Sequence, residues 1–194
     1  FEEREINNIY MDTVNFDIFK ENIDWLSNRN KIRIRWYGEK YGPIKGKLEI
    51  KSKTGKVGKK TYFKIYNFNF NSKSKIKDIK NEILKNNIPH TLKEYFIKSY
   101  PTLFNRYSRR YFLSHDSKIR ITIDFRINNY KISNSPINHI LLPYSIPNMI
   151  MEVKYSSKEK FIDFISINIL AISFDIFKWF EKYIPQKNCQ AQSL

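Results

Sequence analysis

Cysteine and acidic residues are both scarce in this chain of 194 residues. The single cysteine, Cys189, excludes a disulfide framework and a cysteine-based zinc site within the chain, and it fits a reducing compartment such as the cytoplasm. Asp and Glu number 19 against 35 Lys and Arg, which gives a formal net charge of +16. This excess predicts a polyanionic partner: nucleic acid, anionic lipid or a phosphate-rich molecule.

Long apolar runs and histidines are also few. The most apolar stretch, 161–180, is interrupted by Asp163, Asn168 and Asp175, so it predicts a buried or amphipathic helix rather than a membrane span. The three histidines fall in predicted loops or turns, and we expect them at the surface rather than in a catalytic role. The sequence therefore offers no convincing nucleophile or catalytic histidine.

What is present is enough hydrophobic and aromatic sequence, 41% and 16%, for one domain with a core. Period-two alternation predicts strands at 6–12, 31–37, 47–53, 60–66, 103–114, 118–126 and 150–155, with weaker strands within 130–147. Helical spacing predicts helices at 16–26, 76–87 and 91–99 and a helical segment from about 156 to 184. The pattern is α+β with a mostly antiparallel sheet, forming a single domain over 1–185 before a frayed tail at 186–194.

Several of these strands have one apolar face and one face that is mostly cationic, because successive side chains point to opposite sides of a strand. The charged faces carry Lys31, Arg33 and Arg35; Glu49, Lys51 and Lys53; Lys60, Tyr62 and Lys64; Tyr107, Arg109 and Tyr111; Lys118, Arg120, Thr122, Asp124 and Arg126; and Glu152 and Lys154. Two interpretations remain open. The face is either the solvated side of a sheet or the interior of a closed barrel that grips a phosphate chain.

The order of the strand motifs resembles that of one family. The motifs are Ile9-Tyr10-Met11-Asp12-Thr13, Arg33-Ile34-Arg35-Trp36-Tyr37-Gly38, Leu48-Glu49-Ile50-Lys51-Ser52-Lys53, Tyr107-Ser108-Arg109, Arg120-Ile121-Thr122-Ile123-Asp124 and Met151-Glu152-Val153-Lys154. In this order they resemble the VTC-type polyphosphate polymerase domain of the triphosphate tunnel metalloenzymes. The likeness runs from about residue 5 to residue 155.

The resemblance implies a mostly antiparallel β-barrel, the triphosphate tunnel, with helices packed outside and a C-terminal helical segment. It also implies a metal-dependent phosphotransferase that moves the γ-phosphoryl group of ATP onto a growing polyphosphate chain. The implied phosphate-contacting residues are Arg33, Arg35, Lys51, Lys60, Arg109, Arg120 and Lys154. Lys31, Lys53, Lys64, Lys118, Tyr107 and Lys182 are further candidates for substrate binding. Glu152, with Glu49 as a second candidate, would hold Mn²⁺ or Mg²⁺, which prefer oxygen ligands.

Departures from the family pattern keep other functions open. The strand with which the family usually begins is missing or reduced to residues 1–5, so we expect a chain that lacks its natural N-terminal strand. Triphosphate hydrolysis and non-catalytic polyphosphate binding therefore remain alternatives. Nucleic-acid binding is disfavoured because carboxylates interleave the bases and no RNA-binding motif is present. Without a membrane span, any membrane association would pass through a partner.

Overall fold

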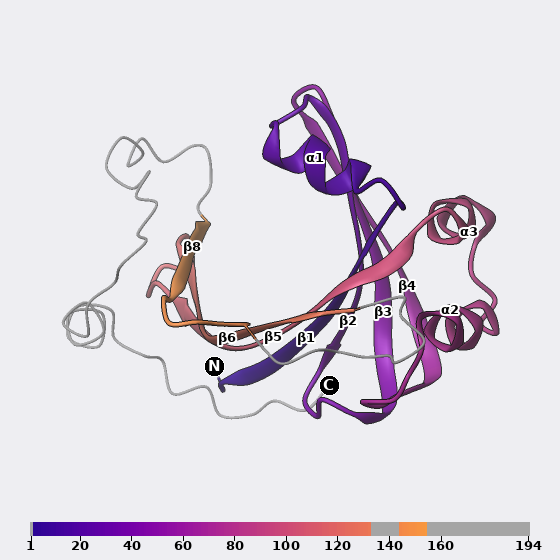
Figure 1. The fold of residues 1–194 in the computed structure, drawn as a ribbon. Coiled ribbons are helices and arrows are strands. Elements are labelled where there is room, and N and C mark those ends of the chain that lie inside the picture. Colours follow the sequence, from indigo (N-terminus) through magenta and orange to yellow (C-terminus); the bar gives the residue numbers. More distant parts are fainter. Residues whose placement is uncertain (1, 133–143, 155–194) are drawn as a thin grey trace. The chain divides into compact units, whose positions relative to one another are not determined.

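The computed structural model describes residues 2–132 and 144–154. In this part of the chain the elements are β1 (Arg4–Asp12), α1 (Asp17–Ile23), β2 (Asn28–Tyr37), β3 (Gly42–Thr54), β4 (Val57–Phe70), α2 (Ile76–Leu84), α3 (His90–Ile97), β5 (Tyr100–Leu113), β6 (Arg120–Lys131), β7 (Tyr144–Ile146) and β8 (Ile150–Lys154) (Figure 1). The strands and the first three helices predicted from periodicity are thus confirmed. The predicted C-terminal helix, and Lys182 with it, lies outside the described residues.

The strands form one sheet in the order β4-β3-β2-β1-β5-β6-β7, and β8 also pairs with β6. The pairs β1–β2, β2–β3, β3–β4 and β6–β8 are antiparallel, and the sheet is mostly antiparallel as predicted. The predicted closed barrel is wrong for the described strands, because β4 has only β3 as a neighbour and does not pair with β7 or β8. Alternation identifies the polar face of each strand, but closure depends on strand tilt and on the stagger between the two edges, which alternation does not encode.

The chain divides into two compact units. Unit 2 comprises residues 6–106 and 128–144, and it holds β2, β3, β4 and all three helices. Unit 1 comprises residues 1–5, 107–127 and 145–194, and its described part holds β7, β8 and segments of the strands that run through both units. Each unit is described by itself below.

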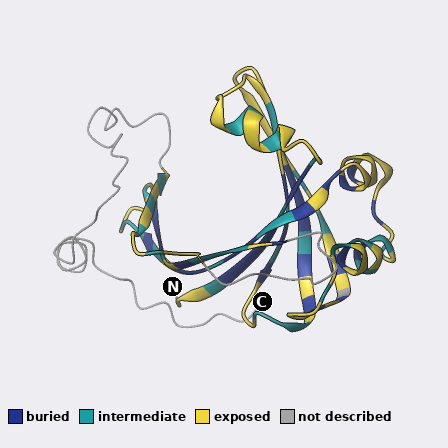
Figure 2. Cartoon of the chain, in the orientation of Figure 1, coloured by how far each residue is buried: buried dark blue, intermediate teal, exposed yellow. Residues whose placement is uncertain are grey.

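The core of unit 2 lies between the apolar face of the sheet and the helices α2 and α3. Trp36 is at its centre, stacked on Phe104 with ring centroids 5.7 Å apart and in edge contact with Phe70 at 5.5 Å. The amphipathic helices contribute Ile79 and Ile83 from α2, together with two residues of α3, to the same cluster. Figure 2 shows these inner surfaces as buried. Because the helices cover the apolar face, the opposite face of β2, β3 and β4 carries the charged side chains.

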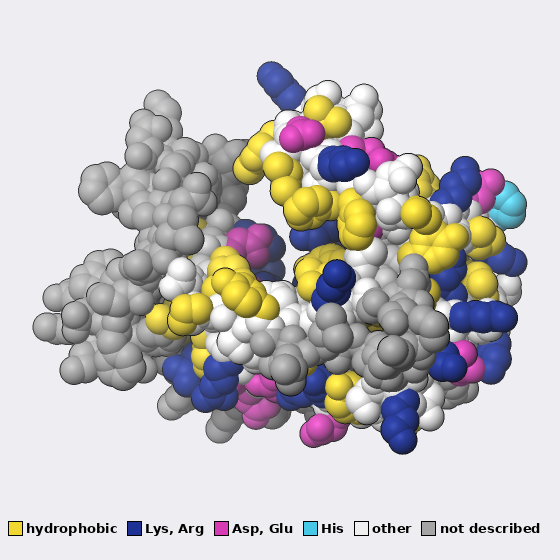
Figure 3. All heavy atoms as spheres, in the orientation of Figure 1, with side chains coloured by type: hydrophobic (Ala, Val, Ile, Leu, Met, Phe, Trp, Pro, Cys, Tyr) yellow, Lys and Arg dark blue, Asp and Glu magenta, His cyan; other side chains and the backbone are white. Residues whose placement is uncertain are grey.

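Helix α1 is fixed by the carboxylate of Asp12 at the end of β1. Asp12 is 5% exposed and accepts hydrogen bonds from the backbone N–H groups of Thr13 at 2.8 Å, Ile18 at 2.9 Å and Phe19 at 3.0 Å. The groups of Ile18 and Phe19 lie in the first turn of α1, where a helix start leaves N–H groups without an intrahelical partner. The helix has no fully buried residue, and hydrophobic side chains gather at the surface around it (Figure 3). Its position therefore depends on this anchor more than on apolar packing.

Unit 1 has a smaller core of Phe112, Ile121 and Ile123, against which Met151 and Val153 of β8 pack. The register Ile121–Val153 and Ile123–Met151 places these apolar pairs on one side of β6 and β8. The charged residues at alternate positions consequently lie on the other side. No helix in the described part of the chain is long and apolar enough to span a membrane.

Candidate functional site

Four strands of unit 2 present one continuous polar surface, which we call the charged face. The register between the strands places its residues in three rows that cross the sheet. The first row contains Asn8, Arg35, Lys47 and Lys64, the second contains Tyr10, Arg33, Glu49 and Tyr62, and the third contains Lys31, Lys51 and Lys60. Directly opposed residues share a face, and the intervening positions on β1, β2 and β3 are buried core, whereas those on β4 are half-buried. The face thus holds seven cations and one carboxylate within four adjacent strands.

Glu49 is that carboxylate, and two cations contact it. Arg33 Nε donates to Oε2 at 2.8 Å, Arg33 Nη2 lies 2.7 Å from the same oxygen as an ion pair, and Lys60 Nζ lies 2.9 Å from Oε1. The Glu49 side chain is 7% exposed, whereas that of Lys60 is 52% exposed. Burial alone would raise the pKa of Glu49, but Lys60, Arg33 and Arg35 outweigh burial and hold this pKa below its ordinary value. Glu49 therefore stays ionised and orients Arg33.

Tyr10 lies beside Arg33 on the same face. The ammonium group of Lys31 is 4.7 Å from the centroid of its ring, a cation–π contact. Burial would raise the pKa of the phenol, but the charges of Lys31, Arg33 and Arg35 and a hydrogen bond with Arg33 lower it below the ordinary value. The phenol is thus a polar group that responds to the charge density of the face.

Arg35 is positioned by an amide rather than by a carboxylate at its Nε. Its Nε donates to Asn8 Oδ1 at 2.8 Å, and these two residues are direct cross-strand partners. At the next row the Nε of Arg33 donates to a carboxylate. The two arginines of the Arg-x-Arg motif therefore both donate through Nε, but to acceptors of different charge on opposite neighbouring strands.

Unit 1 holds a second group of charged residues around β6 and β8. Arg109 donates from Nε to Asp124 Oδ1 at 2.5 Å and from Nη2 to Oδ2 at 2.7 Å, a bidentate pair. Burial would lower the pKa of Arg109, but the hydrogen bonds and charge of Asp124, with Tyr107 and Tyr111, raise this pKa above its ordinary value. Arg109 is consequently a fixed cation.

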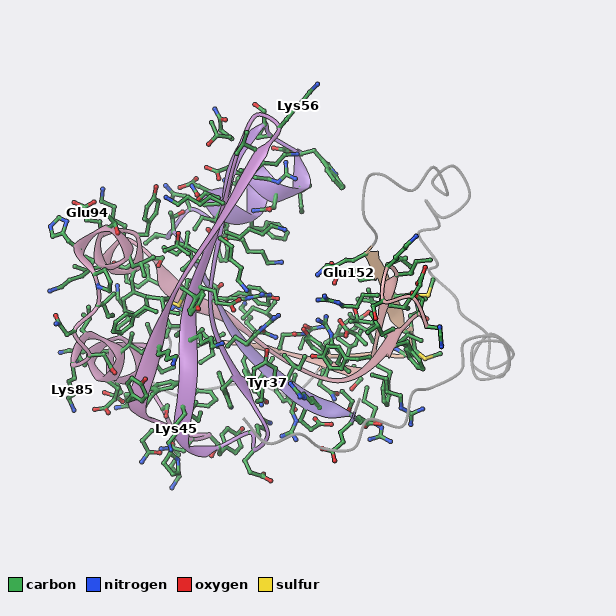
Figure 4. All side chains as sticks on the ribbon, turned by 180° about the vertical axis from the view of Figure 1, so that it is seen from behind. Tyr37, Lys45, Lys56, Lys85, Glu94 and Glu152 are labelled. Carbon is green, nitrogen blue, oxygen red and sulfur yellow. The ribbon has the colours of Figure 1, made fainter. Side chains whose placement is uncertain are left out.

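The register between β6 and β8 sets Arg120 opposite Lys154 and Thr122 opposite Glu152. Glu152 Oε1 lies 3.2 Å from Lys154 Nζ, and Glu152 is marked on β8 in Figure 4. Thr122 Oγ1 is buried and has no hydrogen-bond partner among residues 2–132 and 144–154. The described residues contain no group of three His, Cys, Asp or Glu side chains that could hold a metal ion. Mg²⁺ and Mn²⁺ can bind through one or two carboxylates with waters and phosphate oxygens, so the chemistry of Glu152, whose cross-strand partner is Thr122, fits such an ion.

The structure brings the predicted site residues together in two places. The charged face collects Lys31, Arg33, Arg35, Glu49, Lys51, Lys60 and Lys64, with Lys53 at the end of its hairpin, and unit 1 holds Tyr107, Arg109, Lys118, Arg120, Glu152 and Lys154. Sequence reasoning missed Asn8, Tyr10 and Lys47 on the charged face. Continuing the alternation two positions before Glu49 would have found Lys47. Tyr10 and Asn8 gave no such signal, because their strand does not alternate charged with apolar residues.

One comparison with known proteins gives a family. The family model described as VTC domain matches residues 2–193, nearly the whole chain. A search of curated proteins with this sequence found no match. The match confirms the resemblance that the strand motifs suggested, and its extent includes both groups of charged residues. The chain therefore belongs to the VTC domain family.

Proposed function

We propose that this chain is a metal-dependent polyphosphate polymerase that transfers the γ-phosphoryl group of ATP to a growing polyphosphate chain. The observation that carries the proposal is the charged face, with seven cations and one carboxylate over four strands. Membership in the VTC domain family supports a function related to polyphosphate. A linear polyanion matches this surface because its charges repeat along the chain, as the cations do along the strands.

Phosphoryl transfer requires mainly positioning and charge stabilisation from the protein, so a site without a catalytic nucleophile suits it. A guanidinium has five N–H donors, and the pair with Glu49 uses only part of those of Arg33. We assign phosphate contacts on the charged face to Arg33, Arg35, Lys51 and Lys60. Lys31, Lys53 and Lys64 would bind further phosphates of the chain. Glu49 would hold Arg33 and Lys60 in place.

In unit 1 the proposed phosphate contacts come from Arg109, Arg120 and Lys154. Tyr107 and Lys118 would contribute to binding there. Glu152 would hold Mn²⁺ or Mg²⁺, with Thr122 Oγ1 as a polar neighbour. When bound, the ion would offset negative charge on the phosphates. Glu49 remains a second predicted metal ligand, although an ion there would have to displace Arg33 or Lys60.

The test is incubation of the protein with ATP and Mn²⁺, followed by detection of polyphosphate, and a parallel incubation with tripolyphosphate, followed by measurement of released phosphate. Polymer formation supports the polymerase. Phosphate release alone would replace it with a hydrolase, and salt-sensitive tripolyphosphate binding without turnover would replace it with a binding module. Absence of binding and of both activities refutes the proposal. Competition between RNA and tripolyphosphate for the same site would separate nucleic-acid binding from these functions.

A matched pair of variants localises the effect. Arg35→Ala removes a cation from the charged face and should weaken tripolyphosphate binding while the protein remains folded. Lys77→Ala removes an exposed cation from α2, on the other side of the sheet, and should leave binding unchanged. Equal losses in both variants would show that only the total charge matters, contrary to a site on this face.

A further inference from the structure

Three asparagine side chains form a hydrogen-bonded row that ends on Arg35. Asn8 Oδ1 accepts from Arg35 Nε at 2.8 Å, and Asn8 Nδ2 donates to Asn105 Oδ1 at 3.3 Å. Asn105 Nδ2 in turn donates to Asn129 Oδ1 at 2.8 Å. The row crosses β2, β1, β5 and β6 entirely within unit 2. Each amide thus connects two neighbouring strands.

The direction of this row follows from the chemistry of arginine. A guanidinium can only donate hydrogen bonds, so Asn8 must present its oxygen to Arg35 and its amide nitrogen to Asn105. Asn105 must then accept from Asn8 and donate to Asn129. Reversing any one amide would place two donors or two acceptors against each other. The donor and acceptor assigned to each position are therefore fixed by Arg35.

Two of the three amides are also buried, and Asn129 is half-buried, so the loss of a hydrogen bond in the row is costly. Asn8 is fully buried and Asn105 is 9% exposed. A buried amide that loses a partner leaves a polar group with neither a hydrogen bond nor solvent, which is unfavourable. Apolar residues could fill these positions at the centre of a sheet, and hydrophobic packing alone gives no reason for three amides in line. Their common effect is to present one neutral acceptor to the Nε of Arg35.

We propose that Asn8 is a positioning residue for phosphate binding by Arg35, and that Asn105 and Asn129 hold it in the required orientation. This inference rests on the proposed function, because it concerns the same charged face. A neutral acceptor fixes the plane of the guanidinium without adding negative charge to the face. The carboxylate of Glu49 fixes Arg33 in the same way but does add a negative charge. Arg35 would therefore attract phosphate more strongly than Arg33, whose charge Glu49 partly offsets.

The proposal predicts that the positions differ in their tolerance of aspartate. Asn8→Asp retains an acceptor for Arg35, but it adds a negative charge and removes the donor to Asn105. Within the row Asn129 only accepts a hydrogen bond, from Asn105 Nδ2, and Asn129→Asp retains this acceptor. Asn15→Asp adds the same charge at an exposed site before α1 and serves as the matched control.

The experiment is calorimetric titration of the wild type and the three variants with sodium tripolyphosphate. Asn8→Asp should raise the Kd about tenfold, which corresponds to about 1.4 kcal/mol. Asn129→Asp and Asn15→Asp should stay within about twofold of the wild type. In an Arg35→Ala background Asn8→Asp should raise the Kd less than it does in the wild type, because the part of its effect that passes through Arg35 is lost and only the added charge remains. Urea denaturation of each variant separates a loss of stability from a loss of binding.

The outcomes distinguish the inference from the function on which it rests. A wild type that does not bind tripolyphosphate refutes the proposed function. A wild type that binds, with Kd unchanged in Asn8→Asp, overturns the positioning role alone. A lower free energy of unfolding with unchanged Kd would show that the amides are purely structural. Equal weakening by Asn8→Asp and Asn129→Asp would contradict the assigned direction of the row.

Discussion

Replacing Glu49 with Gln should lower the free energy of unfolding and raise the affinity for tripolyphosphate. Glu49 accepts a hydrogen bond from Arg33 Nε, forms an ion pair with Arg33 Nη2 at 2.7 Å, and contacts Lys60 at 2.9 Å. A hydrogen bond to a charged group contributes about 1.5–3 kcal/mol, and a half-exposed ion pair such as that with Lys60 about 0.5 kcal/mol. Because Gln retains one acceptor oxygen, we expect a net loss of about 2 kcal/mol at neutral pH.

The same contacts predict how the difference varies with pH. The pKa of Glu49 in the folded protein lies below the ordinary value of 4.5, since its cationic neighbours outweigh the effect of burial. The stability that ionised Glu49 contributes is therefore fully present above about pH 4.5, and it is lost as the pH falls through the lower folded pKa. Urea denaturation of wild type and Glu49→Gln between pH 7 and pH 3 should show the two free energies converging.

Although Glu49→Gln should lower stability, it should raise the affinity for tripolyphosphate. Removal of a unit charge about 7 Å from a bound phosphate is worth about 0.6 kcal/mol in a water-like dielectric, or about threefold in Kd for each ligand charge at that distance. We expect this tightening in the presence of EDTA. Glu94→Gln, which removes an exposed carboxylate from α3 (Figure 4), should change neither quantity. Weaker binding by Glu49→Gln that appears only with Mn²⁺ would instead make Glu49 a metal ligand and refute this reasoning.

Three further predictions follow from neighbouring contacts. Asp12→Ala removes an acceptor from three backbone N–H groups and should destabilise the protein by about 3 kcal/mol in urea denaturation; a loss below 1 kcal/mol would contradict its role as the anchor of α1. Phe104→Ala should cost about 3–5 kcal/mol, because it leaves a cavity against Trp36, and an unchanged denaturation midpoint would argue against that packing. Tyr10 should ionise at lower pH than an ordinary tyrosine, and the phenolate absorbance difference between wild type and Tyr10→Phe measures this. Added tripolyphosphate should raise that pKa again; no change would place the ligand away from Tyr10.

Much of the charged face could be predicted from sequence because alternation is a local property. Arg33 and Arg35 alternate with Ile32 and Ile34, and the structure buries the isoleucines and leaves the arginines on the opposite face. The hairpin of β3 and β4 follows in the same way. Register then placed Glu49 between cations, which no single strand could have indicated.

Other features depend on partners far apart in the sequence. The bonds from Asn8 to Asn105 and from Arg35 to Asn8 join residues 97 and 27 positions apart. An asparagine in a strand gives no local sign of such a partner. The prediction of a closed barrel was wrong for a related reason, because closure depends on how the two edge strands of the sheet meet. The pairing of Arg109 with Asp124 was similarly hidden, although both had been placed on a charged face.

The rows of the charged face place lysines directly opposite one another, as at Lys31–Lys51, Lys51–Lys60 and Lys47–Lys64. Like charges in such pairs oppose strand pairing. A bound polyanion would relieve this repulsion, and at a hundredfold excess over its Kd a ligand adds about 2.7 kcal/mol to stability. The folded fraction would then follow the supply of polyphosphate. In the absence of a polyanion, simple salt should partly screen the repulsion between these lysines, so the melting temperature of the free protein should rise with ionic strength.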